Sequence, residues 1–262
     1  MIKLACATLS AEGFEYRDFH RTFEMLPAAG FRHVEFNLWF PETMLPSKVR
    51  DLCQRCHAAG LAPVAVHGNG FDLSGEAGLT RDLAHKIRLL EIACELGCDV
   101  VSISGVRRGK GGGLDGVIAV LRNLAPAAEE LGVRVALENH ADNNIENLAD
   151  YEAILGAIDS PAVGVCIDTG HFDAADVDIG ELIDRVGDRV NHIHVKENRG
   201  RGKVAFTRFG EGTTDNHHVI RRMIDRGFSG CITCELSPQD RPSTVEDLRT
   251  AYEMFRQYET NA

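Results

Sequence analysis

The feature that most constrains the fold is a unit repeated along the whole chain: an amphipathic stretch, then a glycine, then a short run rich in Val and Ile. Such a glycine suits the left-handed residue that ends many helices. Alternating helices and short apolar strands predict a parallel sheet covered by helices. The glycines in question are Gly30, Gly60, Gly97, Gly132, Gly187 and Gly227.

The number of units favours a closed barrel. Eight units in 262 residues predict a single (β/α)₈ TIM barrel, a fold of about 250 residues, with residues 1–262 as one domain. A doubly wound open sheet usually carries a glycine-rich turn after its first strand, and residues 8–13 lack one. Strands are expected at 3–9, 33–38, 62–67, 100–105, 134–139, 163–168, 190–196 and 231–236, and helices at 17–29, 47–59, 79–96, 114–131, 176–186, 217–226 and 245–258.

The amino-acid composition limits the kinds of partner that the protein is expected to bind. The formal net charge of −11, from 39 acidic and 28 basic residues, disfavours a nucleic acid as partner. No apolar run of about 18 residues predicts a membrane span, and no apolar leader opens the chain. We interpret the eight cysteines as buried apolar residues rather than as disulfides or a zinc site, which favours a cytoplasmic protein. The protein could also form a homo-oligomer, and the sequence leaves this open.

Polar and charged residues, whose burial is energetically unfavourable, recur at the predicted carboxyl ends of the strands, where barrel enzymes place their catalytic groups. Burying several carboxylates together at one face is strongly unfavourable without a cation. His192 lies two residues before His194 and is therefore expected one layer deeper, in the core. The residues at the strand ends are Glu35, His67, Glu138, His140, Asp168, His171, His194, Lys196 and Glu235.

Four of these residues form a plausible ligand set for one divalent metal ion: Glu138, Asp168, His194 and Glu235. Three carboxylates and one imidazole suit Mn²⁺ or Mg²⁺ first, with Co²⁺ and Zn²⁺ as alternatives. Such a set leaves coordination positions open for a chelating substrate. The sequence therefore predicts a metal centre at the barrel mouth.

At these residues the sequence resembles the xylose isomerase-like TIM-barrel superfamily. That group includes ketose 3-epimerases, hydroxypyruvate isomerase, inosose dehydratase and the endonuclease IV type of nuclease. The most specific stretches are the Asp-Thr-Gly-His at 168–171 and the Gly-Glu-Gly at 210–212. The resemblance covers essentially the whole chain and is carried by residues 135–139, 166–171, 191–200, 209–212 and 234–237.

The resemblance implies that the four residues named above are the metal ligands and that Glu138 and Glu235 also form the acid/base pair. It further implies that His171 and Arg199 contact the reacting oxygens of the substrate. Two departures put 3-epimerisation of a free ketose in doubt. Asn143 and Asn144 stand where those epimerases carry a further Glu, and the arginine comes one residue early.

Other residues at the same face are expected to bind substrate: His67, Glu35 and Lys196, unless Lys196 pairs with Glu211 or another acid. The basic loop at 106–113 is either an anion-binding lid or a solvated loop. Residues 213–215 are expected to cap the following helix.

These residues and the resemblance together predict a divalent-metal-dependent isomerase or epimerase acting on a small carbohydrate: a sugar, sugar acid or sugar phosphate. Glu138 or Glu235 would remove a proton next to the carbonyl to give an enediolate. Loss of a β-hydroxyl would instead make the enzyme a dehydratase of a keto-sugar or keto-inositol. An endonuclease IV-like enzyme is less favoured, because Ser102 and Ser104 stand where that type has a histidine. A binding protein without catalytic activity is a further alternative.

Overall fold

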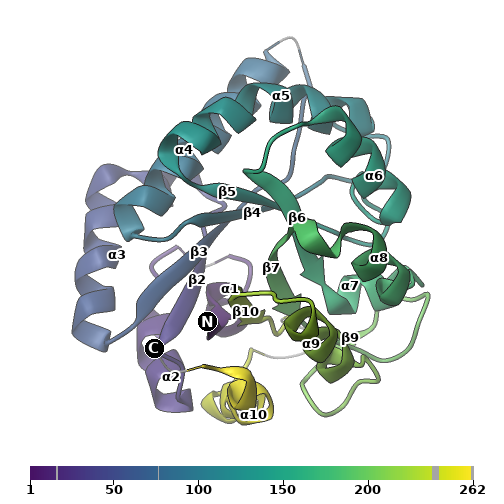
Figure 1. The fold of residues 1–262 in the computed structure, drawn as a ribbon. Helices are drawn as coiled ribbons and strands as arrows, with labels where there is room; N and C mark the ends of the chain where they lie inside the picture. The colour runs from purple at the N-terminus through teal and green to yellow at the C-terminus, as the bar shows by residue number, and fades with distance from the viewer. Residues whose placement is uncertain (16, 76, 238–241, 261–262) are drawn as a thin grey trace.

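The computed structural model describes residues 1–15, 17–75, 77–237 and 242–260. Within them, parallel strands close into a barrel in the spatial order β1-β10-β7-β6-β5-β4-β3-β2, so the predicted (β/α)₈ architecture is confirmed (Figure 1). The barrel strands are β1 (Ile2–Ala7), β2 (His33–Asn37), β3 (Ala62–Gly68), β4 (Val100–Ser104), β5 (Arg134–Glu138), β6 (Val163–Asp168), β7 (Val190–Val195) and β10 (Gly230–Cys234). A short antiparallel pair, β8 (Glu197–Asn198) and β9 (Phe206–Thr207), follows β7.

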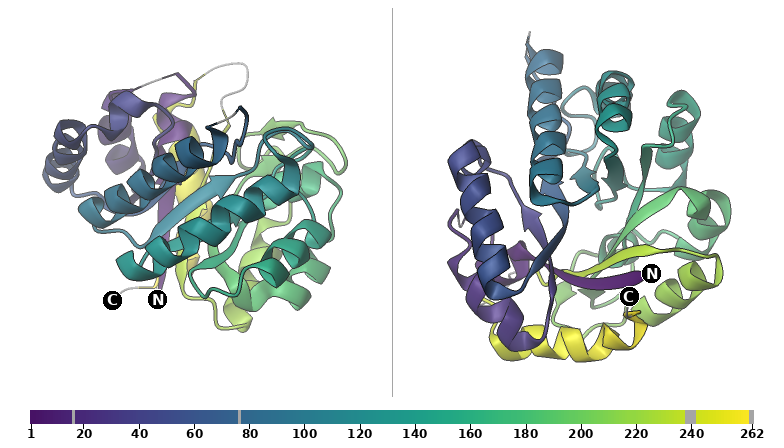
Figure 2. Two further views of the ribbon diagram at one scale, coloured as in Figure 1. Left: turned by 90° about the horizontal axis from the view of Figure 1, so that it is seen from above. Right: turned by 60° about the vertical axis from the view of Figure 1, so that its left-hand side comes forward.

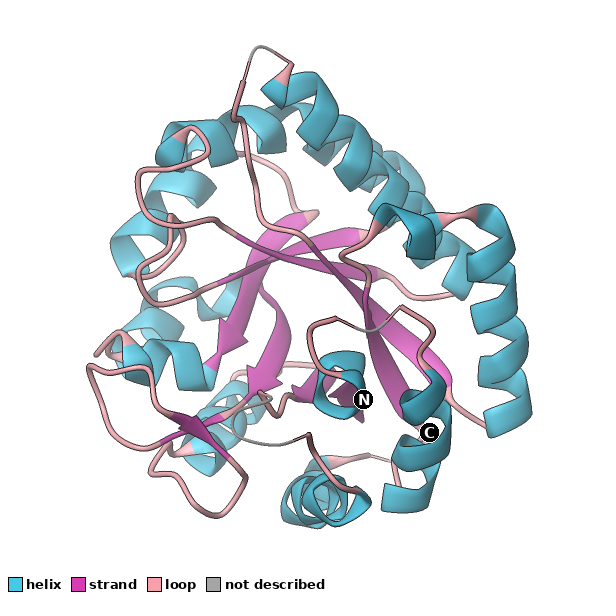
Figure 3. Ribbon diagram, turned by 180° about the vertical axis from the view of Figure 1, so that it is seen from behind, coloured by secondary structure: helices cyan, strands magenta, loops and turns pink. Residues whose placement is uncertain are grey.

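The helices lie mainly around the outside of the barrel (Figure 3), and two short ones directly follow the first and sixth strands of the chain at the carboxyl end of the barrel. The helices are α1 (Thr8–Glu12), α2 (His20–Ala29), α3 (Pro46–Ala59), α4 (Gly78–Leu96), α5 (Gly113–Leu131), α6 (Leu148–Ala157), α7 (Thr169–Ala174), α8 (Ile179–Val186), α9 (Asn216–Asp225) and α10 (Val245–Phe255), with 3₁₀ turns η1 (Pro41–Met44), η2 (Gly187–Arg189) and η3 (Arg256–Tyr258). The first and last described segments of the chain lie side by side (Figure 2), where Thr260 Oγ1 accepts a hydrogen bond of 2.7 Å from the Ile2 amide.

The core has two parts because successive strand residues face opposite sides. Outward-facing side chains such as Ile193 and Val195 pack against the helices in the larger cluster. The inside of the barrel holds a smaller cluster of mainly short side chains: Ala5, Val64, Ala65, Val100, Ala136, Cys166 and Cys231. The same alternation turns His192 and His194 inward, so polar side chains occupy the barrel interior.

The predicted strands and the structure differ mainly at the strand ends. Residues 8 and 9, expected in the first strand, belong to α1, because Asn37 Oδ1 accepts hydrogen bonds from the Thr8 hydroxyl and the Leu9 amide. Of the predicted glycine caps, Gly30, Gly60, Gly97 and Gly132 are left-handed as expected. The prediction is wrong for Gly187, whose φ of −57° is right-handed and which begins η2. Gly227 has a positive φ but follows Arg226, which caps α9.

Helix α6 was not expected from the sequence because its apolar residues do not fall on one face. The structure shows a capping box at its start, in which Asn147 and Asp150 each accept a backbone amide of the other residue. The predicted cap at 213–215 is confirmed, since the Asp215 side chain accepts from the His218 amide at the start of α9.

All eight cysteines are free, as expected, including the two pairs that lie three residues apart in the sequence, Cys53 with Cys56 and Cys231 with Cys234. Among the residues that the structure describes, no helix combines the length and apolar character needed to cross a membrane.

Candidate metal centre

The four predicted ligands come together at the carboxyl end of the barrel. Their ligand atoms all lie within 4.8 Å of one another. Glu138 ends β5, Asp168 ends β6, His194 lies on β7 and Glu235 follows β10 directly. Each is buried, with at most 5% of its surface exposed. Four strands of the barrel, remote in sequence, thus deliver one compact set of donor atoms.

The imidazole of His194 lies between two groups of carboxylates. Its Nδ1 is 2.5 Å from Glu138 Oε1 and 3.4 Å from Glu235 Oε2. Its Nε2 is 3.1 Å from both carboxylate oxygens of Glu35. Burial alone lowers the pKa of His194, but Glu35, Glu138 and the Cys166 side chain outweigh it and hold the pKa well above its usual value. The surroundings therefore attract positive charge to this ring.

Lys196 adds one cation beside the cluster. Its ammonium lies 2.9 Å from Asp168 Oδ2 and 2.7 Å from Glu235 Oε1, and the residue is 2% exposed. Burial lowers the pKa of Lys196, but Asp168 and Glu235 outweigh burial and raise it above its ordinary value. Lys196 thus pairs with acids, which was the alternative to the expected contact with substrate, and that contact stays a prediction. Glu211 is paired instead with Arg199.

Two stacked histidines extend the cluster on the side of β5. His171 and His140 have ring centroids 3.8 Å apart, and His140 Nε2 is 2.8 Å from Glu138 Oε2. Asp168 Oδ1 accepts a hydrogen bond from the His171 amide, because Asp168 caps the start of α7. The last residue of β6 thereby places His171 beside the cluster. Burial and the neighbouring His140 and Lys196 lower the pKa of His171 well below its usual value.

A cavity of about 280 Å³ opens above this cluster. Glu138 and Glu235 are part of its wall, whereas Asp168 and His194 lie below it. Phe206 closes one side, with its ring 5.0 Å from the Lys196 ammonium and 4.6 Å from the His171 ring. The lining residues are Leu9, Phe14, Asn37, Trp39, His67, Glu138, His140, His171, Lys196, Phe206, Glu235 and Ser237.

The predicted substrate-binding residues divide into two groups. His67, His171 and Lys196 line the cavity. Glu35 and Arg199 do not. Glu35 is fully buried below the cavity, where it is hydrogen-bonded to His192. The Arg199 side chain is 59% exposed and pairs with Glu211, so the structure does not bring it to the cluster. His192 is fully buried, as expected for a core position.

The basic loop at 106–113 does not line the cavity either. Arg108 pairs with Glu146 and Asp150 on the neighbouring loop and helix. Asn144, which with Asn143 forms the first departure from the epimerase pattern, accepts from the Gly109 amide and donates to the Lys110 carbonyl. The loop is therefore fastened by acids and by Asn144, and the structure gives Asn144 a role in loop packing.

The aromatic wall of the cavity was missed by sequence reasoning. Phe14 and Trp39 stack at 5.9 Å between ring centroids, and Phe206 comes from β9. These residues lie in connections after strands, where no periodic pattern marks them. Trp39, the one tryptophan of the chain, stands two residues after β2 and was the available signal.

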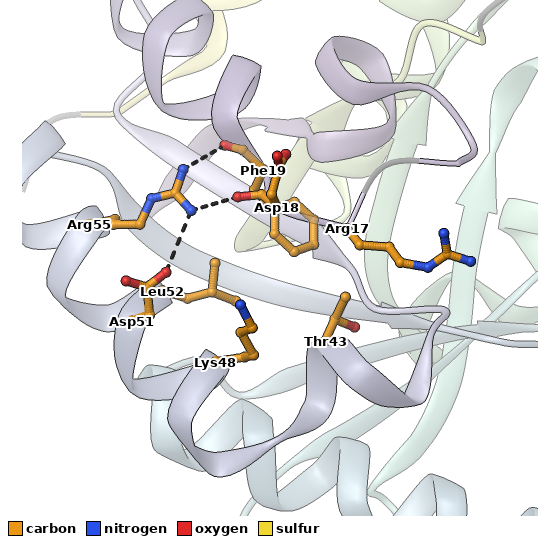
Figure 4. A pocket seen from close by; sticks show the side chains of 8 residues that line it. All are labelled: Arg17, Asp18, Phe19, Thr43, Lys48, Asp51, Leu52 and Arg55. Atoms are coloured by element: carbon orange, nitrogen blue, oxygen red, sulfur yellow. Dashed lines mark hydrogen bonds and ion pairs between the residues drawn. The ribbon is translucent and has the colours of Figure 1, made fainter.

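A second, smaller hollow of about 50 Å³ lies between residues 17–19, which lead into α2, and the segment formed by η1 and α3, away from the cluster (Figure 4). Arg55 donates to the carbonyls of Asp18 and Phe19 and pairs with Asp51. Phe19 has a φ of 54°, a strained value for a residue with a side chain, and these contacts hold it at the start of α2. This hollow is a packed junction between two helices.

The donor set at the barrel mouth fits a divalent cation. Three carboxylates converge with one imidazole, and Glu35 adds a fourth acid on the other side of that ring, so the acids outnumber the cations even when both Lys196 and His194 are charged. Burying like charges so close together is unfavourable unless further positive charge is present. Oxygen donors with one imidazole suit Mn²⁺ and Mg²⁺, and they also accept Zn²⁺.

Comparison with known proteins assigns the family. Residues 23–258 match the model of the xylose isomerase-like TIM barrel, which covers most of the chain. The protein belongs to this family. The resemblance seen in its motifs is thereby confirmed.

Individual relatives are more distant. An inosose dehydratase from Lactiplantibacillus plantarum is 29% identical over 153 residues, which cover 52% of this chain and 50% of the relative. The chain thus matches about half the length of that relative. Two solved structures share the fold. A D-tagatose 3-epimerase-like protein has a TM-score of 0.81 at 19% identity, covering 98% of this chain and 96% of that one. An IolI protein with a bound zinc atom has a TM-score of 0.80 at 20% identity, covering 99% and 100%.

Proposed function

We propose that this protein is a divalent-metal-dependent isomerase or epimerase of a small carbohydrate. The observation that carries the proposal is the position of Glu138 and Glu235: both belong to the cluster of donor atoms, and both reach the cavity wall. Together with Asp168 and His194 they would hold the ion. A divalent cation bound there would polarise a substrate carbonyl and make the neighbouring C–H bond more acidic.

The remaining chemistry falls to side chains of this chain. Glu138 or Glu235 accepts the proton from carbon, and the same or the other carboxyl group returns it. Return to a different carbon isomerises the sugar, and return to the opposite face epimerises it. Lys196 and His171 stand beside the two carboxylates and can donate hydrogen bonds to substrate oxygens on which negative charge develops.

The cavity supports a small, polar substrate. A volume of about 280 Å³ accommodates a single sugar or cyclitol ring. Phe14, Trp39 and Phe206 offer apolar surface for the C–H face of such a ring, while the floor is polar. The cavity therefore supports the prediction of a carbohydrate substrate. We also keep, as proposals, residues 1–262 as one domain and a cytoplasmic location; residues 261–262 lie outside the described part.

A dehydratase is the second candidate, and two observations favour it. The relative from Lactiplantibacillus plantarum is an inosose dehydratase. In addition, the Lys196 ammonium faces the cavity beside Glu235, where it can assist the departure of a β-hydroxyl group as water. The same first step, proton removal by a glutamate, serves both candidates.

Incubation in D₂O with Mn²⁺ and a panel of ketoses, keto-inositols and sugar acids tests the proposal. We expect solvent deuterium in one substrate or its product, in a metal-dependent manner. An isomer or epimer identifies the first candidate, and loss of water identifies the second. If no compound exchanges with any divalent metal, the proposed chemistry is wrong.

Metal analysis of the purified protein tests the centre itself. We expect one ion per chain. Because the IolI protein carries zinc, Zn²⁺ must be compared with Mn²⁺, Mg²⁺ and Co²⁺ in the same exchange assay. Three zinc ions per chain, with tight binding of abasic DNA, would instead indicate the nuclease alternative.

A further inference from the structure

Glu35 is a fully buried carboxylate on β2, below the cavity and outside its lining. Its carboxylate accepts hydrogen bonds from three side chains. His192 Nε2 lies 2.7 Å from Oε2, the Ser102 hydroxyl lies 2.7 Å from Oε1, and His194 Nε2 lies 3.1 Å from both oxygens. An ionised carboxylate can only accept hydrogen bonds, so each of these partners must donate.

The contact with His194 decides which ring nitrogen of that residue is free. If Nε2 carries the hydrogen that is donated to Glu35, then Nδ1 carries the lone pair in the neutral ring. Nδ1 is the nitrogen that faces Glu138 and Glu235. In the metal-free ring the 2.5 Å contact with Glu138 Oε1 places a second hydrogen on Nδ1, and an ion bound among these carboxylates would take the place of that hydrogen and receive the Nδ1 lone pair.

The contact with Ser102 reaches a second histidine. The Ser102 hydroxyl donates to Glu35, so its oxygen is left to accept from His67 Nδ1 at a distance of 3.0 Å. His67 lines the cavity. With Nδ1 engaged by Ser102, the nitrogen that remains for a ligand in the cavity is Nε2, which carries the lone pair.

We propose that Glu35 is the positioning residue of this centre and fixes the tautomers of two histidines from one buried carboxylate. Directly, it reserves the Nδ1 lone pair of His194 for the ion; through Ser102, it leaves the Nε2 lone pair of His67 facing the cavity. The first half rests on the proposed metal centre. Hydrogen bonds from metal-binding histidines to carboxylates commonly orient the ring and strengthen binding of the ion.

Two other roles for Glu35 fit the structure less well. It is not a substrate contact, because it is fully buried and does not line the cavity. Glu35, His67 and His194 also lie close enough to form a second set of donor atoms. However, both oxygens of Glu35 are already hydrogen-bonded to donors of the protein, and His194 would have to use both ring nitrogens for metals.

The first test is the affinity of the full chain for Mn²⁺, measured by titration calorimetry. Glu35→Gln keeps the shape but turns one acceptor into an amide donor that faces other donors. We expect affinity to fall 10- to 100-fold. The matched control is Glu12→Gln, another buried glutamate, which accepts the Thr22 amide and does not line the cavity; its affinity should change less than about threefold, as expected for a site outside the network.

Ser102→Ala separates the two halves of the proposal, because it removes the link to His67 and keeps the contact with His194. We expect its Mn²⁺ affinity to stay within about threefold of the parent, since Glu35 still accepts the hydrogen bond from His194. Equal Mn²⁺ affinity of a folded Glu35→Gln variant and the parent protein overturns the direct half. If the parent binds no Mn²⁺ or Zn²⁺ at all, the proposed metal centre fails, together with that half.

The tautomers can be read directly by ¹⁵N NMR of histidine-labelled full chain, above the ordinary imidazole pKa of about 6.5. The His67 measurement requires neither metal nor a folded Glu35 variant. We expect hydrogen on Nδ1 in the parent and a mixture of tautomers in Ser102→Ala. In the Zn²⁺-loaded parent, His194 should carry hydrogen on Nε2. Hydrogen on Nε2 of His67, or on Nδ1 of His194, overturns the corresponding half.

Discussion

Two lysines are fully buried in this molecule, and their surroundings differ in one respect. Lys86 on α4 lies 3.1 Å from Asp82 Oδ1, one turn away, and 3.0 Å from the Gly70 carbonyl. Its ammonium also faces the Phe71 ring at 5.4 Å. Lys196 at the barrel mouth contacts two carboxylates of a larger buried set. One ammonium is matched by one carboxylate, and the other is outnumbered.

The difference shows which buried charges point to function. The Lys86–Asp82 pair is balanced and fastens the loop after β3 to α4, so its role is structural. Around Lys196 the acids are in excess, and only added positive charge relieves their repulsion. A surplus of one sign, more than burial itself, distinguishes the candidate site.

The largest effect on activity that we expect comes from replacing the acids near Lys196. Glu138→Gln and Glu235→Gln each remove a candidate base, and the rate of deuterium exchange into the identified substrate should fall by about 10²- to 10⁴-fold. Thermal melting should show that the variants are folded. Glu211→Gln, an exposed glutamate paired with Arg199, serves as the control. Exchange within tenfold of the parent in both variants would remove these glutamates from the chemistry.

Breaking the balanced pair should cost stability and leave the metal centre intact. Lys86→Met strands the buried Asp82 carboxylate, and we expect a loss of about 3–5 kcal/mol of unfolding free energy. Replacing both partners, in Lys86→Met with Asp82→Leu, should restore most of it, because no buried charge is then left unpaired. Chemical denaturation measures both. Equal stability of the single and double variants would contradict this account of the pair.

The barrel, and the meeting of Glu138, Asp168, His194 and Glu235 at one end of it, could be predicted because they depend on local patterns. The glycine-ended helices and Val/Ile runs give the βα units, and the alternation along β7 places His192 and His194 on the inner face. Helix α6 was missed because its apolar residues surround the helix. The capping pair Asn147 and Asp150 marks its start but says nothing of its packing.

The parts of the site that could not be predicted depend on distances across the barrel. Nothing in the sequence around Glu35 shows that it meets His192 and His194, which lie 157 and 159 residues further along. Arg199 is the opposite case: it lies near His194 in sequence, yet its side chain points to Glu211 on the surface. Side-chain direction in a long connection is set by contacts that periodicity does not encode.

Added metal should stabilise the folded chain through the acidic cluster around Lys196, and not through the Lys86–Asp82 pair. At a concentration 100 times its Kd, a ligand that binds only the folded chain adds about 2.7 kcal/mol. We expect Mn²⁺ to raise the melting temperature of the parent, and EDTA to reverse the rise. The double variant at Lys86 and Asp82 should keep the full increment, whereas Asp168→Ala, which lacks one of the proposed ligands, should lose most of it. An undiminished increment in Asp168→Ala would place the ion elsewhere.

The smallest expected effect is a pH dependence of the balanced pair. Burial raises the pKa of Asp82 above its ordinary value of 3.8, although Lys86 partly offsets this. The folded chain therefore holds a proton on Asp82 more tightly than the unfolded chain does. Stability from this group is full below the unfolded pKa and is lost as pH rises through the folded one. Compared with Asp82→Asn, whose side chain does not titrate, the parent should gain stability as pH falls toward 3.8. Urea denaturation of both proteins across this range measures the difference. A parent that loses stability relative to Asp82→Asn on acidification would mean that Lys86 lowers the Asp82 pKa more than burial raises it, and the pair would then be a net source of stability at neutral pH.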